Sequence, residues 1–529
     1  MVVAALLSLS LASAAAAVSI GPTTDLNIVN AVVAPDGFNR SAVLANGLVP
    51  GPTIIANKGD TFSINVVDGL TDNTMLRSTS IHWHGFFQAN NSWADGPSFV
   101  NQCPIAANNS FLYTFPTKDQ AGTFSICRRS TAMVCAGAMV VYDPEDPHLS
   151  LYDVDDDSTV ITIADWYHGP ASTLGAIPTL ISTLINGLGR YAGGPTSELA
   201  VITVTKGLRY RFRLVNIACD PNFIFTIDQH DFTIIEVDSV NHEPLGCRRD
   251  PNLRRPALLF RPQRRPGHRQ LLDPHLSLTV ARLASTTVST RLSSVTSARP
   301  SRTPLPPVET STNALVEQNL HPLNGPAVPG QPVPGGADIT LNLAIALDFT
   351  TFTFTVNGVS FVPPTAPVLL QILSGAQAAT DLLPSGSVYV LPPNKVVEIS
   401  VPGGSPGAPH PFHLHGHNFH VVRSAGNSSY NFVNPVRGRC IVSIPTNQPT
   451  SSPSATSSPP ALPPPTMSPS VSSPDNAGPW FLHCHIDFHL EIGLAIVFAE
   501  DTNTVSKSTQ PAAWDQLCPI YDALTPDQL

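Results

Sequence analysis

Proline most constrains how this chain can fold, since it occupies 53 of the 529 positions. A proline ring fixes φ and removes a hydrogen-bond donor, so proline at this density disfavours long helices. No segment shows a sustained helical period, and short β-branched runs are separated by Gly, Pro, Asn and Asp, as in β-sandwiches or barrels. We therefore predict an all-β chain, with strands in residues 25–29, 61–67, 160–164, 200–204, 232–237 and 397–401.

The N-terminus and the charge balance indicate where the chain works. Residues 1–17 are almost wholly apolar or small and end in an alanine run, which is typical of a secretory signal peptide. The alternative, a membrane anchor, needs a longer apolar span, and this one is interrupted by Gly21 and Pro22. A net charge of −10 argues against a nucleic-acid partner. We expect a secreted protein without membrane or nucleic-acid partners, with glycosylation sequons at Asn39, Asn90, Asn108 and Asn427.

Three histidine clusters carry the chemistry. Alternating His-x-His on a strand points both imidazoles to one face, because the side-chain period of a strand is two. Each pair can therefore bind one metal ion or two adjacent ions. The clusters are Ile-His-Trp-His-Gly at 81–85, His-Pro-Phe-His-Leu-His-Gly-His at 410–417 and His-Cys-His-Ile-Asp-Phe-His at 483–489.

The third cluster gives the most specific prediction about metal sites. His483 and His485 share one face of a strand, while Cys484 points to the other face. One strand can thus serve two metal centres. After a turn, His489 can join Cys484, and His410 can supply a second imidazole. Two imidazoles and one thiolate form the ligand set of a blue copper centre.

Two alternatives compete with copper at these positions. A single His-x-His pair occurs in strands by chance, and zinc also binds Cys and His. Structural zinc sites, however, use four ligands with compact local spacing. Clustered histidines from three distant segments exceed what one zinc ion needs. His417 and His420 are expected to support the ligands or to lie at the surface.

These motifs together resemble those of fungal laccases, which are secreted multicopper oxidases built from three cupredoxin domains. HWHG, HPFHLHGH and HCHIDFHLE match three of the family's four copper motifs. The similarity runs through residues 21–124, 139–245, roughly 310–437 and 478–529. The resemblance implies three cupredoxin-like Greek-key β-sandwich or barrel domains. With composition shifts near Asp146 and Asn319, we expect these domains at 18–147, 148–318 and 319–529.

Site roles follow from the resemblance position by position. It implies four copper ions, namely one type 1, one type 2 and a type 3 pair. It also implies a disulfide between Cys103 and Cys518, and a phenol-contacting carboxylate at Asp220, for which a loop-capping aspartate is the alternative. The implied ligands are Cys484, His410 and His489 for type 1, with Leu494 in the axial position, His82 and His413 for type 2, and His84, His415, His483 and His485 for type 3.

The resemblance also implies a reaction. Small phenols would lose one electron at a time at the type 1 copper, and the electrons would pass along the Cys484 backbone to His483 and His485. Dioxygen would be reduced there to two waters. An aliphatic residue in the axial position leaves a weak axial ligand, which favours a high potential. The protein is expected to act as a monomer.

The fourth family motif is missing. Family members carry His-Ser-His shortly after the Ala-Gly-Thr-Phe turn, whereas this chain continues with Ser125–Gly137. One choice of codons for these residues, read two bases later, gives His-Leu-Ser-Thr-Gln-Tyr-Cys-Asp-Gly-Leu-Arg-Gly, which is the family sequence from the second histidine onward. The expected motif is therefore legible in another reading frame.

Two further zones allow the same interpretation, namely 247–307 and 438–474. The first is basic, with 12 of the 23 arginines in 248–302, and the second is rich in Pro, Ser and Thr. Other frames of both zones can encode alternating strand sequence. The competing interpretations are a polyanion-binding arm for the first zone and a glycosylated stalk for the second.

Three hypotheses for function remain. The first is that the gene encodes a working laccase and this translation of it is damaged, or that a pseudogene preserves the family's pattern. The second is a secreted copper-binding relative that is catalytically impaired, because a type 3 pair lacking two histidines is not fully loaded. The third is another multicopper oxidase, such as a ferroxidase, which would need acids around His489, where Asp487 and Glu491 give a weak signal.

Overall fold

Strands dominate the architecture, as the sequence predicts. The computed structural model describes residues 19–128, 136–170, 173–174, 178–220, 223–227, 230–247, 278–282, 289–291, 315–402, 410–424, 429–443, 466–467, 469–471, 476–525 and 528. Within these ranges the longest α-helices have six residues. No helix there is long and apolar enough to cross a membrane.

The N-terminal block contains two sheets, ordered β1-β4-β9-β8-β6 and β3-β2-β5-β7. In β5 and β7 the alternation of apolar and polar residues buries every second side chain, so one face of this sheet packs on the core. The strands are β1 Ser19–Ile20, β2 Thr23–Val33, β3 Arg40–Ala45, β4 Thr53–Asn57, β5 Thr61–Gly69, β6 Ile81–His84, β7 Ser110–Pro116, β8 Gly122–Arg128 and β9 Ala136–Tyr142.

The second block contains the sheets β12-β11-β10-β13, β14-β17-β18 and β15-β16. The strand predicted at 200–204 is wrong. Its alternate residues Ala200, Ile202 and Val204 are buried, but the segment forms a single bridge, at Thr203, and no strand. The strands are β10 Val160–Trp166, β11 Ser182–Ile185, β12 Leu188–Gly189, β13 Arg213–Asn216, β14 Phe223–Ile227, β15 Phe232–Val237, β16 Val240–Cys247, β17 Leu278–Arg282 and β18 Ser289–Arg291.

The third block contains the sheets β19-β23-β29-β25-β26, with β28 on β23, then β20-β21 and β22-β31-β30-β24-β27. Its strands are β19 Ile339–Asn342, β20 Ile345–Asp348, β21 Thr353–Val356, β22 Val388–Leu391, β23 Val397–Pro402, β24 His410–Leu414, β25 Phe419–Val421, β26 Arg437–Gly438, β27 Cys440–Ser443, β28 Thr466–Met467, β29 Pro469–Val471, β30 Gly478–Cys484 and β31 Ala495–Glu500. Its helices are α1 Val368–Leu373, α2 Asp487–Glu491, α3 Thr502–Val505, α4 Ala512–Asp515 and α5 Leu517–Asp522.

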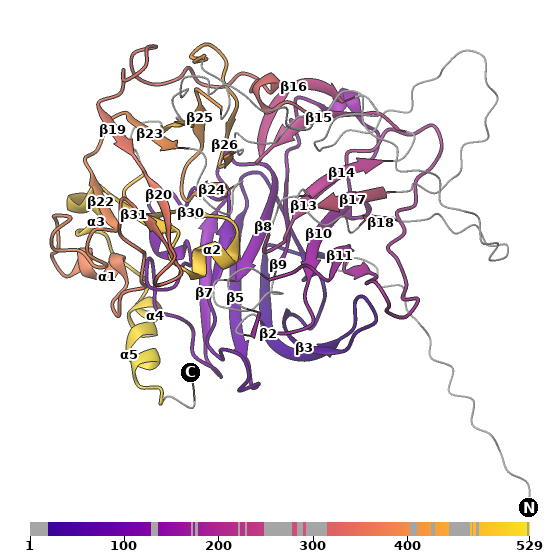
Figure 1. The fold of residues 1–529 in the computed structure, drawn as a ribbon, viewed down its shortest axis with the longest axis horizontal. Helices are drawn as coiled ribbons and strands as arrows, with labels where there is room; N and C mark the ends of the chain where they lie inside the picture. Colours follow the sequence, from indigo (N-terminus) through magenta and orange to yellow (C-terminus); the bar gives the residue numbers. More distant parts are fainter. Residues whose placement is uncertain are drawn as a thin grey trace, which may run out of the picture.

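The third block shares hydrophobic cores with both of the others. One core joins strands β5, β6 and β7 to β31 and α1, and a second joins β10 and β14 to β24 and β30. Figure 1 shows the indigo and purple strands of the N-terminal block between the magenta second block and the orange to yellow third block. The strands that carry the histidine motifs, β6, β24 and β30, therefore lie where the first and third blocks meet.

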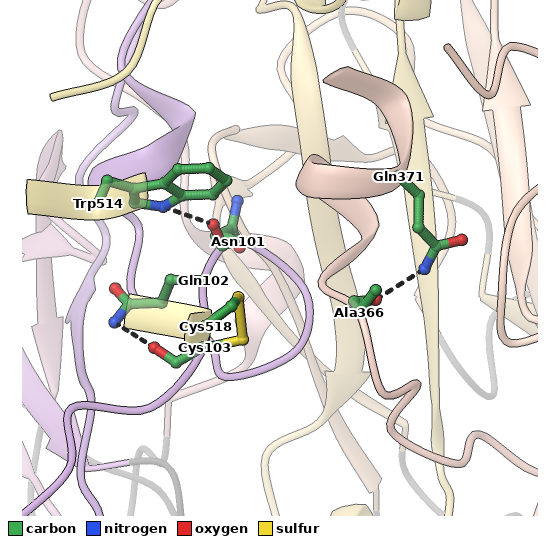
Figure 2. The surroundings of a disulfide bond; sticks show 7 residues. All are labelled: Asn101, Gln102, Cys103, Ala366, Gln371, Trp514 and Cys518. Atoms are coloured by element: carbon green, nitrogen blue, oxygen red, sulfur yellow. Dashed lines mark hydrogen bonds between the residues drawn. A yellow bond between two sulfur atoms is a disulfide. The ribbon is translucent and has the colours of Figure 1, made fainter. Parts of the chain in front are cut away.

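A disulfide links the N-terminal block to helix α5 near the C-terminus. Cys103 and Cys518 are bonded across a sequence separation of 415 residues, as the resemblance implies. Beside this bond, Trp514 on α4 donates a hydrogen bond to the Asn101 carbonyl at 3.0 Å (Figure 2). The Asn101 amide in turn donates to the carbonyl of Pro479 at 3.1 Å. The C-terminal helices are thus fastened to the N-terminal block beside β30.

Replacing Cys103 with serine should lower the stability of this junction by about 3–5 kcal/mol, because the bond restricts a very long loop in the unfolded chain. Urea unfolding followed by tryptophan fluorescence measures the effect, with Cys247→Ser as a control that removes a buried thiol but no crosslink. An unchanged midpoint in Cys103→Ser would show that the bond contributes nothing to stability.

Acid should destabilise the protein partly through His420. Burial, and then the Arg437 charge, lowers the pKa of His420 to about 4. An unfolded chain takes up this proton near pH 6.5, so stability falls as pH drops from about 6.5 to 4, at up to about 1.4 kcal/mol per pH unit. His420→Phe should flatten this slope, as measured by urea unfolding across the pH range. An equal slope in both proteins would contradict the assignment.

Candidate metal centres

Two centres lie on opposite faces of one strand pair. In the antiparallel register of β24 and β30, His413 is opposite His483 and Phe412 is opposite Cys484. Directly opposite residues share a face of the sheet, and successive residues alternate between faces. The imidazoles of His413 and His483 therefore point to one side, while the Cys484 thiol and, by parity, His410 point to the other.

The structure brings His410, Cys484 and His489 together. The Cys484 sulfur lies 3.6 Å from Nδ1 of His410 and 3.6 Å from Nδ1 of His489, and the two nitrogens are 3.1 Å apart. All three side chains are buried. Helix α2 returns His489 to this place, since the His489 amide donates to the Ile486 carbonyl at 2.9 Å. This compact triangle of two nitrogens and one sulfur fits a copper ion.

The surroundings of this triangle are apolar. Leu494 is completely buried, and its backbone is fixed by a hydrogen bond from the Cys484 amide to its carbonyl at 3.1 Å. The Phe354 ring lies 4.8 Å from the His489 ring. Burial, with a smaller effect from His410, lowers the pKa of His489 to about 3. His489 is therefore neutral near pH 7 and available as a ligand.

The second centre gathers six imidazoles from β6, β24, β30 and the residues directly after the last two. The ligand nitrogens of one group of three lie within 4.8 Å of one another. Two Nε2 atoms, one on His415 and one on His483, face each other at 3.2 Å. The group of three is His82, His413 and His415. The other ring pairs within 5.0 Å, by centroid distance, are His82 with His415 at 3.8 Å, His84 with His413 at 4.0 Å, His413 with His415 at 4.7 Å and His84 with His485 at 5.0 Å.

Backbone oxygens set the tautomers of these rings. Nδ1 of His82 contacts the Asp95 carbonyl at 2.9 Å, Nδ1 of His413 the Arg439 carbonyl at 3.1 Å, and Nδ1 of His483 the Cys484 carbonyl at 2.7 Å. A carbonyl only accepts, so each Nδ1 carries the proton and each Nε2 presents a lone pair. Within the described residues, the buried Nε2 of His82 has no hydrogen-bond partner. Such lone pairs fit metal ions.

Asp95 is a site residue that the sequence analysis missed. Its buried carboxylate lies 2.7 Å from Nδ1 of His415 and 3.3 Å from Nδ1 of His82, so it orients two rings. The loop that carries it runs close to β6, since a Cβ on Gly96 would lie 1.8 Å from the Ile81 carbonyl oxygen. In the sequence, the Asp-Gly-Pro motif after Trp93 was the feature that could have drawn attention to Asp95.

Strand β8 lies where the missing motif is expected. Its register places Ser125 opposite His84 and Cys127 opposite His82. Ser125 Oγ and Cys127 Sγ are 3.9 Å apart, which puts both on the same face. On the face that carries the histidines, this strand therefore presents the Ser125 hydroxyl and the Cys127 thiol, where the family motif would present imidazoles. Residues 129–135 lie outside the described residues.

The loop with Asp220 packs against α2. The Asp165 carboxylate accepts hydrogen bonds from the amides of Cys219 and Asp220, both at 2.9 Å. The Cys219 carbonyl accepts one from the Asp487 amide, also at 2.9 Å, at the start of the helix that carries His489. The role of Asp220 toward a phenol remains a prediction.

The predicted processing and glycosylation positions lie at the periphery or outside the described ranges. Asn39, Asn90 and Asn108 are exposed, as acceptor asparagines must be. Asn427 and the expected signal peptide at 1–17 lie outside the described residues, as does most of 248–307 and 444–474. Their assignments stay predictions.

Comparisons with known proteins agree with this geometry. Multicopper oxidase family models match residues 27–146 and 157–248, and a third matches 361–452 with 468–504. Laccase-2 of Pleurotus ostreatus is 52% identical, covering 96% of this chain and 94% of its own. Laccase-4 of Trametes villosa is 50% identical, covering 97% and 96%.

Solved structures share the fold. Fet3p, described as a multicopper oxidase that functions in iron import, matches with a TM-score of 0.74 at 20% identity, covering 97% of this chain and 98% of its own. The laccase from Botrytis aclada matches with a TM-score of 0.73 at 25% identity, covering 97% and 94%. These neighbours confirm the predicted cupredoxin-like β architecture. The chain therefore belongs to the multicopper oxidase family, and within it to the fungal laccases.

Proposed function

We propose that this chain is a laccase that oxidises small phenols and passes their electrons to dioxygen, which is reduced to water. One observation carries the proposal. Cys484 lies in the first centre, while the neighbouring residues His483 and His485 lie in the second, so a single strand joins the two. A stretch of backbone one residue long on either side of Cys484 is a short route for electrons.

The chain's own residues divide the work. His410, Cys484 and His489 would hold the type 1 copper, and the buried side chain of Leu494, next to Cys484, offers no donor atom, which would favour a high potential. His82 and His413 would hold the type 2 copper, and the remaining four imidazoles a type 3 pair. When bound, copper would supply one-electron chemistry at the first centre and dioxygen reduction at the second. Asp95 orients His82 and His415 throughout.

Substrate access follows from the position of His489. Its side chain is 8% exposed and sits on α2, against the loop of Asp220. A phenol at this edge would give up an electron through the imidazole, and the Asp220 carboxylate would accept the phenolic proton. The relatives are named laccases, and their substrate class supports the assignment.

The register of strand β8 favours a second candidate function, namely a copper-binding relative that reduces dioxygen poorly. Because Ser125 and Cys127 stand opposite His84 and His82, the type 3 pair has two imidazoles for each ion among the described residues. A chain with this strand would bind type 1 copper but reduce dioxygen poorly, as a secreted copper-binding relative. A ferroxidase has less support, because the likeness to Fet3p extends to the fold alone.

Copper spectroscopy on the full secreted chain separates these candidates. We expect a blue thiolate–copper absorption that an added phenol bleaches under nitrogen and that air restores, with phenol preferred over ferrous iron. A blue protein that is bleached by phenol but not restored by air would support the impaired relative. A colourless, copper-free protein would contradict both.

Secretion, a monomeric state and glycosylation complete the proposal. The apolar N-terminus and the exposed sequon asparagines support an extracellular protein. Mass spectrometry of the purified protein from culture medium would locate the mature N-terminus and the glycans.

A further inference from the structure

A buried histidine–carboxylate pair lies behind the second centre. Nε2 of His417 is 3.2 Å from Oε2 of Glu500, and the two side chains are 3% and 0% exposed. On its other side, Nδ1 of His417 is 3.0 Å from the carbonyl oxygen of His415. Neither residue contributes a ligand in the proposed function. A pair of ionisable groups at this depth needs a reason, because burying polar groups costs free energy.

The contacts define the orientation of the His417 ring. The His415 carbonyl can only accept, so Nδ1 of His417 donates to it. Nε2 of the same ring faces a Glu500 oxygen at 3.2 Å, so the carboxylate restrains the ring from the side opposite this hydrogen bond.

The hydrogen bond from His417 would position the His415 ring. It is the imidazole that contacts Asp95 at 2.7 Å, stacks on His82 at 3.8 Å and faces His483 at 3.2 Å. Its own amide donates to the Phe481 carbonyl at 2.9 Å. The hydrogen bond from His417 to the His415 carbonyl thus fixes the peptide group on the other side of the His415 Cα atom.

The neighbouring turn is equally constrained. Gly416 has a φ of +73°, and a Cβ there would lie 2.6 Å from the Trp480 ring. The Asn476 amide donates to the Gly416 carbonyl at 3.1 Å, and the Trp480 indole donates to the Asn476 carbonyl at 2.6 Å. His417 contacts the same indole edge to face. Side chains from β30 and β31 therefore set the backbone between His415 and His417.

We propose that His417 and Glu500 are a positioning pair that holds the His415 imidazole in its copper-binding orientation. The inference rests on the proposed function, since it concerns the copper that His415 would hold as part of the type 3 pair. Supporting groups behind a ligand typically change metal affinity 10–100-fold when they are removed. The type 1 residues Cys484 and His410 lie on the face of β24 and β30 opposite to His413 and His483, so the type 1 centre should be unaffected.

The test is copper affinity measured separately at the two centres. In the full chain, His417→Phe should weaken the binding of non-blue copper about 10–100-fold in a chelator competition, where non-blue copper is measured as total copper minus the copper that the blue absorption reports. Glu500→Leu should have the same effect, and the double variant should be no worse than either single one, because both break one unit. The blue absorption reports type 1 copper and confirms that each variant is folded.

Two further variants act as controls. Glu500→Gln keeps an amide that can donate to Nε2 of His417, so it should restore most of the affinity that Glu500→Leu loses. His420→Phe replaces another buried histidine, three positions along, whose Nε2 bonds the Pro326 carbonyl at 3.2 Å. It should leave copper affinity at both centres unchanged near pH 7.

Wild-type non-blue affinity in both His417→Phe and Glu500→Leu would overturn the inference while leaving the proposed function intact. If His417→Phe does not fold, the contrast between Glu500→Leu and Glu500→Gln decides, and equal affinities in these two would also overturn it. A wild-type chain that binds blue copper but no non-blue copper would remove the second centre from the proposed function, and the inference with it.

Discussion

Replacing Cys484 with serine should remove the blue colour and lower phenol oxidation by roughly 1,000-fold or more, equivalent to about 4 kcal/mol. Cys484 is the only sulfur in the His410 and His489 triangle of the described structure, and a hydroxyl is a poor ligand for this type of copper. Burial raises the pKa of the Cys484 thiol, so copper must displace a tightly held proton. Absorption spectra and turnover of a phenol measure both effects.

Cys247→Ser is the matched control, because Cys247 is another buried thiol, on β16 in the second block. This variant should keep its colour and its turnover. Circular dichroism should show the same fold in both variants, since serine has nearly the shape of cysteine. A blue, active Cys484→Ser protein would contradict the assignment of the first centre.

Replacing His82 with alanine should separate the two centres. The blue absorption should remain, because His82 lies on β6 and has no part in the triangle. Oxygen uptake should fall about 100-fold or more, since His82 loses its contacts with Asp95 and its stacking on His415. Phenol should still bleach the blue band under nitrogen, and air should restore it only slowly.

His242→Ala controls for the loss of a buried imidazole. His242 is completely buried on β16, and its Nδ1 bonds the Val240 carbonyl at 2.8 Å, away from both centres. It should retain oxygen uptake. Equal losses in both variants would mean that His82 acts through general stability, and a colourless His82→Ala protein would show that the two centres are not separable.

The strands and the division of the third cluster could be predicted because both depend on local periodicity. A period of two places His483 and Cys484 on opposite faces whatever the rest of the chain does, and the register of β24 and β30 shows this arrangement. The segment 200–204 has the same alternation and buries the same alternate residues, yet the structure gives it one bridge residue, Thr203, and no strand. Periodicity specifies burial, whereas pairing depends on distant segments.

Asp95 and the His417–Glu500 pair could not be predicted by such patterns. Asp95 meets His415 across 320 positions in the sequence, and Glu500 meets His417 from another strand. The Asp-Gly-Pro motif at Asp95 indicates a turn, but no local pattern identifies either acid as a partner of an imidazole. The proposed copper ligands were recognisable from sequence motifs. The residues that contact and orient these ligands were visible only in the folded structure.

The sequence of the transcript would test whether the anomalous segments 125–137, 247–307 and 438–474 belong to the protein. We expect cDNA across the codons for 120–140, 245–310 and 438–478 to contain the His-Ser-His motif and the missing strands in frame. The register of β8 gives this expectation a structural basis, since Cys127 faces the histidines where an imidazole would complete the type 3 pair. A transcript that encodes the present residues would favour the impaired relative.

The most direct test of the laccase assignment is the stoichiometry of oxygen uptake by the copper-loaded protein expressed from its own transcript, with a simple phenol in an oxygen electrode. The account predicts that four phenols are oxidised for each dioxygen consumed and that no hydrogen peroxide accumulates, because electrons pass from the Cys484 centre to the histidine cluster. Phenol oxidation that yields peroxide, or a protein that is reduced by phenol without consuming oxygen, would contradict it.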